Sequence, residues 1–161
     1  MSESQESKVS KIYLEKRNVY SYPKADDLYA PHMKYPEYLF DTLSGEKNEV
    51  YDMIRSTLHG MKLDEIHYGT AEWNPLGEYI NPGDSVVIKP NLVKNYDSEK
   101  QYECTLTHPA VIKAMIDYCV IARAGHIVIG DAPIQGMDMD KIRVDCHFDE
   151  MIDFYQSKGV N

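Results

Sequence analysis

The sequence predicts an α/β fold built on a Rossmann-like β-α-β-α unit with a parallel sheet. Two short apolar runs, residues 85–90 and 126–130, are typical of strands that are buried on both faces. Each run is followed by an amphipathic segment with helical spacing. Because two strands joined through one helix run parallel with a right-handed crossover, we expect them to be neighbours in one sheet.

Three helices are predicted from apolar residues that recur every three or four positions. The first follows Ser44 as its N-cap and ends at Gly60, the second runs from Pro109 to a stop at Gly125, and the third ends at Gly159. The expected core stripes are Val50, Ile54, Leu58 and Met61, then Ile112, Met115, Ile116, Cys119 and Val120, and finally Phe148, Met151, Ile152 and Tyr155.

Turn signals mark both ends of this unit. Residues 81–84 read Asn-Pro-Gly-Asp, with Pro82 and Gly83 at the positions that a type II turn favours. After Gly159, Val160 and Asn161 resemble the start of a third strand. A two-stranded parallel sheet buries too little to stand alone. Either the N-terminal segment completes the sheet or the chain is the front part of a longer protein, and we favour the second.

The domain organisation follows from the aromatic residues. Residues 1–51 hold seven of the 13 tyrosines, together with prolines at 23, 31 and 36. We expect residues 1–44 to form an extended, partly disordered arm, and residues 45–161 to form the α/β domain as the N-terminal portion of a longer domain. Tyrosine suits packing on a surface, so the arm wraps its own domain or contacts a second copy in a homo-oligomer. We favour the first.

The amino-acid composition argues against several classes of protein. The 161 residues carry 26 acids and 17 bases, for a net charge of -9, which disfavours nucleic acid and anionic membranes as partners. No apolar run reaches the ~20 residues of a membrane span, and the N-terminus lacks a signal-peptide pattern. Cys104, Cys119 and Cys146 include no close pair, so we expect a cytoplasmic protein without disulfides.

Loop lengths place the functional site at one edge of the sheet. The expected strand-to-helix connections, residues 91–108 and 131–147, far exceed the ~2–6 residues that are usual. Both leave the carboxyl ends of the strands, which is where open α/β sheets bind ligands.

Four polar residues at this edge are predicted to bind a small phosphate- or carboxylate-bearing substrate. Lys89 offers a positive charge and Asn91 an amide at the end of the first strand. Thr105 and Thr107 lie at the start of the second helix, whose free N–H groups favour anions. The alternatives are an exposed lysine, an asparagine in a turn and a threonine cap.

Acidic residues and a histidine supply the candidate chemistry. Asp131, directly after the second strand, is predicted to act as a base or to bind a divalent cation such as Mg²⁺, and His108 is a second catalytic candidate. Asp138 and Asp140 form an Asp-x-Asp pattern, which occurs in metal-dependent sugar transferases and could add oxygen ligands. The same residues are typical of a turn, a cap and a solvated loop.

Several standard motifs are absent from the sequence. It contains no P-loop, no G-x-G-x-x-G and no G-x-S-x-G pattern. The cysteines lack the paired C-x-x-C spacing of zinc and iron–sulfur sites, so no iron–sulfur cofactor is expected from this chain.

Across residues 45–135 the chain resembles the Domain of Unknown Function 362 family. The resemblance rests on five segments: 86–93 (Val-Val-Ile-Lys-Pro-Asn-Leu-Val), 107–109 (Thr-His-Pro), 127–133 (Ile-Val-Ile-Gly-Asp-Ala-Pro), 69–75 (Gly-Thr-Ala-Glu-Trp-Asn-Pro) and 82–84 (Pro-Gly-Asp), with the helix start at 48–51. Family members are generally longer, and some carry ferredoxin-type clusters whose cysteine pattern this chain lacks. The family's activity is not established, so the resemblance implies the fold more than the function.

Three functional hypotheses remain open. The leading one is an intracellular enzyme, or part of one, acting on a small anionic substrate, with Lys89 and Asn91 binding the anion and Asp131 as metal ligand or base. The second is a ligand-binding module without chemistry. The third is a redox component whose iron–sulfur cluster is supplied by another segment or partner.

Overall fold

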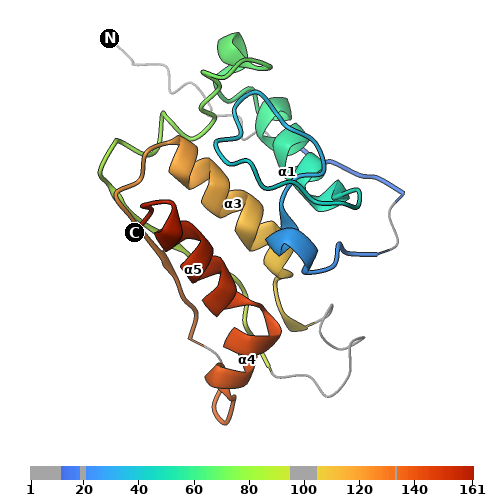
Figure 1. Cartoon of the computed structure of the whole chain (residues 1–161), viewed down its shortest axis with the longest axis vertical. Helices are drawn as coiled ribbons and strands as arrows, with labels where there is room; N and C mark the ends of the chain where they lie inside the picture. Colours follow the sequence, from blue (N-terminus) through green and yellow to red (C-terminus); the bar gives the residue numbers. More distant parts are fainter. Residues whose placement is uncertain (1–11, 19–20, 95–104, 133) are drawn as a thin grey trace, which may run out of the picture.

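The computed structural model describes residues 12–18, 21–94, 105–132 and 134–161. Helices α3 and α5 lie side by side, and α1 packs against the opposite side of α3 (Figure 1). The elements in chain order are the 3-10 turn η1 (Asp26–Tyr29), α1 (Glu49–Gly60), the 3-10 turn η2 (Glu65–His67), β1 (Ser85–Ile88), α3 (Pro109–Ile121), β2 (His126–Ile129), α4 (Met139–Asp145) and α5 (Phe148–Ser157).

The two strands are parallel neighbours, as predicted. Ser85 pairs with His126 and Ile88 with Ile129, and α3 forms the crossover between the strands. The fold class, α/β with an incomplete parallel sheet, is therefore confirmed. The Ile127 N–H donates to the Asn161 carbonyl (2.9 Å), so one hydrogen bond joins the outer edge of β2 to the segment after α5.

Burial of the strands differs from the prediction. Val86, Ile88 and Ile127 pack against Cys119 and Ala122 near the end of α3. On the other face Val87 is 68% exposed, and the neighbouring Val128 is exposed as well. The expectation of strands buried on both faces is wrong for the described residues, because helices cover only one face of this sheet.

The cap of the first helix also differs. Asn48, not Ser44, caps α1, and its side chain accepts a hydrogen bond from the Tyr51 N–H (3.0 Å). The amide of Asn48 donates in turn to the carbonyls of Tyr29 and Ala30 (2.8 and 3.0 Å). A side chain that satisfies both a helix end and a neighbouring turn is favoured over a purely local cap.

Helix ends were predicted with mixed success. The expected turn is present, with Gly83 at a φ of 91° and the Asp84 N–H bonded to the Asn81 carbonyl (3.0 Å). Gly159 ends α5 at a φ of 77°, as expected. Gly125 does not close α3, which ends at Ile121. A Cβ on Gly125 would lie 2.6 Å from the Gly83 carbonyl oxygen, so a close backbone approach explains this glycine.

Two predicted stripe residues and one predicted loop need correction. Met61 and Ile152 are exposed, because Met61 lies beyond α1 and Ile152 lies on the outer side of α5. The connection 131–147 is not a continuous loop, since it contains α4 with Asp138 as its N-cap. A short helix with one fully buried apolar residue, Ile142, leaves little periodic signal in the sequence.

The core joins the aromatic arm to the helices. Tyr29, Tyr38 and Phe40 are buried in the same cluster as the apolar faces of α1, α3 and α5. This region also contains the buried ion pair Lys113–Asp117 within α3 and the partly buried ion pair Glu37–Arg55 between the arm and α1. No helix within the described ranges combines the length and apolar composition needed to cross a membrane.

Candidate anion-binding site

The carboxyl ends of β1 and β2 bring together two residues that are 42 positions apart. Lys89 directly follows β1, and Asp131 follows β2 after Gly130. The ammonium of Lys89 lies 2.8 Å from Oδ1 of Asp131. Parallel pairing of Ile88 with Ile129 places the two residues at the same sheet edge, so the predicted convergence of this pair is observed.

Asp131 is held firmly by its surroundings. Its Oδ2 accepts a hydrogen bond from the Leu92 N–H (2.7 Å), and its side chain is only 8% exposed. The Lys89 ammonium, followed by the N–H groups of Leu92 and Ala132, lowers the pKa of this carboxyl to about 2. Asp131 is therefore ionised at every pH of physiological interest.

Lys89 keeps access to solvent despite this ion pair. Its side chain is 63% exposed, and its Nζ also lies 3.4 Å from Oδ1 of Asn91. Lys89 thus bridges the carboxylate of Asp131 and the amide oxygen of Asn91 at the surface of the molecule. A charged group in this position can exchange one partner for another without a change in the fold.

Asn91 fixes the end of β1 to the start of α3. Its N–H donates to Oγ1 of Thr107 (2.9 Å), and its carbonyl accepts from the Thr107 N–H (2.8 Å). The carbonyl of Thr105 accepts from the Val93 N–H (3.2 Å) in the same antiparallel contact. The backbone amide of Thr107, predicted to cradle an anion, is therefore already paired within the chain.

His108 is placed differently from Lys89 and Asp131. It is the N-cap of α3, where its Nδ1 accepts from the Ala110 N–H (3.2 Å). The ring of Tyr22 stacks on it with centroids 4.0 Å apart, and Tyr29 contacts its edge. Burial lowers the pKa of this imidazole to about 4, so it is neutral at pH 7. This environment is that of a structural cap more than of an acid or base.

The three carboxylates predicted to bind a metal are not gathered in one place. Asp138 caps α4 through the Lys141 N–H (3.1 Å), and the Asp140 side chain is exposed, 3.9 Å from Arg143. Among the residues that the structure describes, no group of three histidine, cysteine or acidic side chains is positioned to hold a metal ion. Residues 95–104, with Cys104, and Pro133 lie outside the described residues.

The sequence offered no signal for two features of this edge. The Leu92 N–H that binds Asp131 is a backbone group, which any residue except proline supplies. The Tyr22 ring that covers His108 comes from a distant part of the chain, and no local spacing relates the two. Both depend on tertiary packing.

Comparison with known protein families finds a match in the same part of the chain. Residues 86–160 match the family described as Domain of unknown function (DUF362). The DUF362 match confirms the resemblance for the part of the chain that holds nearly all of β1, the crossover α3 and β2, together with Lys89 and Asp131. Residues 45–85 lie outside it. No curated protein and no solved structure matches the chain. The DUF362 description names no activity, so function has to be inferred from the geometry of the site.

Proposed function

We propose that the carboxyl edge of the β1–β2 sheet binds a small phosphate- or carboxylate-bearing molecule together with a divalent cation such as Mg²⁺. The observation that carries this proposal is the Lys89–Asp131 ion pair, in which a well-buried carboxylate holds an exposed ammonium at the end of two parallel strands. Ligands of open α/β sheets bind at this edge.

The charge state of Asp131 favours binding over proton transfer. A general base works best when its pKa lies near the operating pH, and a carboxylate with a pKa of about 2 is a weak base at pH 7. The same ionised oxygen is a good ligand for Mg²⁺, which prefers carboxylate oxygen. Asp131 is therefore proposed as a cation ligand.

Exchange of partners explains how both ions are accommodated. A divalent cation on Asp131 replaces the ammonium of Lys89, which then turns to the incoming anion. Mg²⁺ is commonly held by one or two carboxylates and by the oxygens of a bound phosphate, so a single aspartate suffices when the anion is present. Oδ1 of Asn91 lies beside Lys89 and adds a further oxygen ligand.

Binding of the anion with its cation is a step that an enzyme and a binding module have in common. General acid–base catalysis would also need a group whose pKa lies near the operating pH, and neither Asp131 nor His108 has such a pKa. Binding is therefore the function that the described residues support best.

Isothermal titration with inorganic pyrophosphate, with and without Mg²⁺, tests this proposal. We expect Mg²⁺ to strengthen binding to the unmodified chain, and Lys89→Met to weaken it at least tenfold in both conditions. Asp131→Asn should bind pyrophosphate more tightly than the unmodified chain when Mg²⁺ is absent, because Lys89 is released, and should gain nothing from Mg²⁺.

Lys141→Met provides the matched control. Lys141 forms an ion pair with Asp145 at 2.7 Å on the surface of α4, so its loss removes the same charge and leaves the Lys89–Asp131 pair in place. It should leave pyrophosphate affinity unchanged. Equal affinities of Lys89→Met and Lys141→Met would refute the proposed site.

A further inference from the structure

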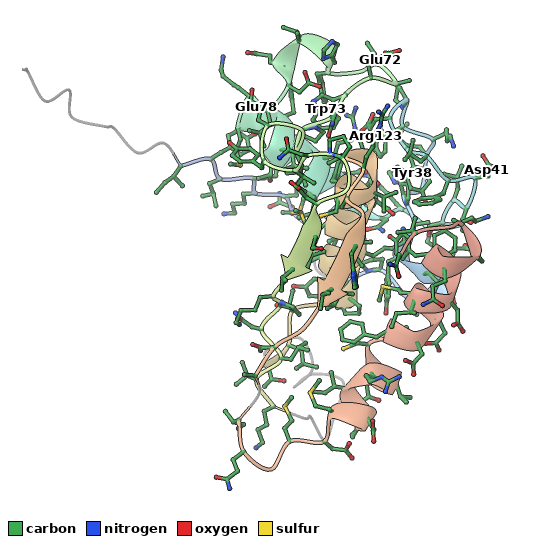
Figure 2. All side chains as sticks on the ribbon, turned by 90° about the vertical axis from the view of Figure 1, so that its left-hand side faces the viewer. Tyr38, Asp41, Glu72, Trp73, Glu78 and Arg123 are labelled. Carbon is green, nitrogen blue, oxygen red and sulfur yellow. The ribbon has the colours of Figure 1, made fainter. Side chains whose placement is uncertain are left out.

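A pocket lies at the opposite end of α3 from Lys89 and Asp131. It has a volume of about 420 Å³, within the ~300–1,000 Å³ typical of small-molecule sites. Figure 2 shows Glu72, Trp73 and Arg123 at this end of the molecule, on the amino-terminal side of the strands. The helix between the two ends has 13 residues and is about 20 Å long, so the two sites are separate.

The walls of this pocket are mainly apolar. They include Leu39 from the arm, Ile80 and Pro82 from the segment before β1, and Val120 from the last turn of α3. Leu39 is largely exposed at the rim and offers apolar surface to a ligand.

Hydrogen-bond acceptors dominate the polar part of the lining. Oδ1 of Asn74 is buried and accepts no hydrogen bond within the described part of the chain. The amide of Asn74 packs against Gly77, where a Cβ would approach its Nδ2 to 2.6 Å. The carboxylate of Glu72 lines the same pocket. A buried acceptor without a donor carries a free-energy penalty, and a ligand N–H group would remove it once the amide of Asn74 turns toward the pocket.

The end of α3 adds two further acceptors. The amides of Gly125 and His126, which would continue the helix, donate instead to the Asp84 carbonyl (2.8 and 3.4 Å). The carbonyls of Ile121 and Ala122 therefore lack their intrahelical partners, and both residues line the pocket. The negative end of the helix dipole also favours a positive group here.

Arg123 is the one cationic side chain in the lining, and its backbone is strained. It occupies the C′ position of a Schellman motif, with Arg123 N–H to Val120 O (2.9 Å) and Ala124 N–H to Cys119 O (3.1 Å). Its φ of 63° lies in the left-handed region, where glycine is preferred. Its guanidinium forms no hydrogen bond or ion pair with the described residues. Because the backbone conformation disfavours arginine, we attribute the presence of arginine at this position to a role of its side chain.

We propose that this pocket binds a free apolar α-amino acid. The ammonium group is received by Oδ1 of Asn74, the carboxylate of Glu72 and the carbonyl end of α3. The α-carboxylate pairs with the guanidinium of Arg123, which suits bidentate recognition of carboxylates. The aliphatic or aromatic side chain of the ligand covers the apolar wall. This site is independent of the proposed anion site.

Fluorescence of Trp73 gives a direct readout, since it is the single tryptophan of the chain. Trp73 is fully buried next to Asn74, and its Nε1–H donates to the Leu63 carbonyl (3.0 Å). Titration with L-leucine should give a saturable change, and isothermal titration should give the same affinity. Arg123→Gln and Asn74→Ala should each weaken binding at least tenfold.

Arg123→Gly separates a binding role from a structural one. Glycine relieves the positive φ, so this variant should melt at a higher temperature than the unmodified chain and yet lose L-leucine binding. Lys141→Gln, on the surface of α4, is the control and should bind normally. A variant Arg123→Gly that binds as well as the unmodified chain would overturn the proposal.

Two blocked ligands identify the groups that are recognised. N-acetyl-L-leucine lacks the ammonium charge, and L-leucinamide lacks the carboxylate. Both should bind at least tenfold more weakly than L-leucine. If leucinamide binds equally well, the site recognises a peptide N-terminus, and if N-acetyl-leucine binds equally well, it recognises a C-terminus. Either result, or the absence of any L-leucine binding, refutes the free amino acid as ligand.

Discussion

Removing the charge of Lys113 should destabilise the protein strongly. Its Nζ lies 2.9 and 2.7 Å from the two carboxylate oxygens of Asp117, and both side chains are only 1% exposed. The Tyr155 hydroxyl donates to Oδ1 of Asp117 (2.6 Å). Lys113→Met keeps the apolar length of the side chain but leaves Asp117 as a buried charge with a neutral donor alone.

The size of the effect follows from this burial. Removing one partner of a buried ion pair costs about 3–5 kcal/mol, because the remaining charge stays out of water. The Lys113 ammonium also lies 5.2–5.8 Å from the ring centroids of Tyr38, Phe40, Phe154 and Tyr155, a contact worth ~2 kcal/mol when desolvated. Against a total stability of ~5–15 kcal/mol, Lys113→Met should lower the melting temperature by about 10 °C or more.

Urea unfolding followed by circular dichroism measures this change, with Lys141→Met as the control. The Lys141–Asp145 pair has the same four-residue spacing and a 2.7 Å separation, but its side chains are 45% and 21% exposed. Its loss should cost less than ~1 kcal/mol. The double variant Lys113→Met/Asp117→Leu should recover most of the stability, since no unpaired charge remains. Equal costs for Lys113→Met and Lys141→Met would refute the reasoning.

Two further predictions concern acid. The Lys89 ammonium holds the pKa of Asp131 at about 2, below its ordinary 3.8. The ionised carboxylate therefore stabilises the folded state above about pH 4, and this contribution is lost as the pH falls toward 2. The urea midpoint of Asp131→Asn should lie below that of the unmodified chain at pH 6 and approach it near pH 2. Burial holds the pKa of His108 at about 4, below its ordinary 6.5, so on acidification the unfolded chain takes up a proton first and the free energy of unfolding falls between about pH 6.5 and 4. His108→Asn keeps a capping acceptor and should lose this pH dependence of stability. An unchanged pH dependence would contradict the low pKa of His108.

The sequence predicted correctly those features that depend on neighbouring residues in the chain. Apolar runs located β1 and β2, and helical spacing between them located the crossover, so the parallel pairing followed. Asn48 could not be identified as the cap of α1, because its advantage over Ser44 comes from the carbonyls of Tyr29 and Ala30, which only the folded arm brings close. The predicted end of α3 at Gly125 was wrong for a related reason, because Gly125 makes a close backbone contact with the 81–84 turn.

The candidate site was predictable to the extent that it depends on topology. Parallel strands bring their carboxyl ends to one edge, so the meeting of Lys89 and Asp131 follows from the strand assignments alone. The state of each group does not follow from topology. The low pKa of Asp131 needs the Leu92 N–H, and the neutral state of His108 needs the Tyr22 ring above it.

The two proposed sites at the ends of α3 have opposite charge preferences, and the helix dipole accounts for only part of this difference. The dipole favours an anion near the N-terminus and a cation near the C-terminus by about 0.3–1 kcal/mol each, which is too little for specific binding. Specificity must come from side chains, and these differ at the two ends. Lys89 and Asp131 can select an anion that arrives with a cation, whereas Asn74, Glu72 and Arg123 can select a ligand that carries both charges on adjacent groups. Pyrophosphate should therefore not compete with L-leucine for binding. A substitution at one site should lower the affinity of that site alone and leave the affinity of the other site unchanged.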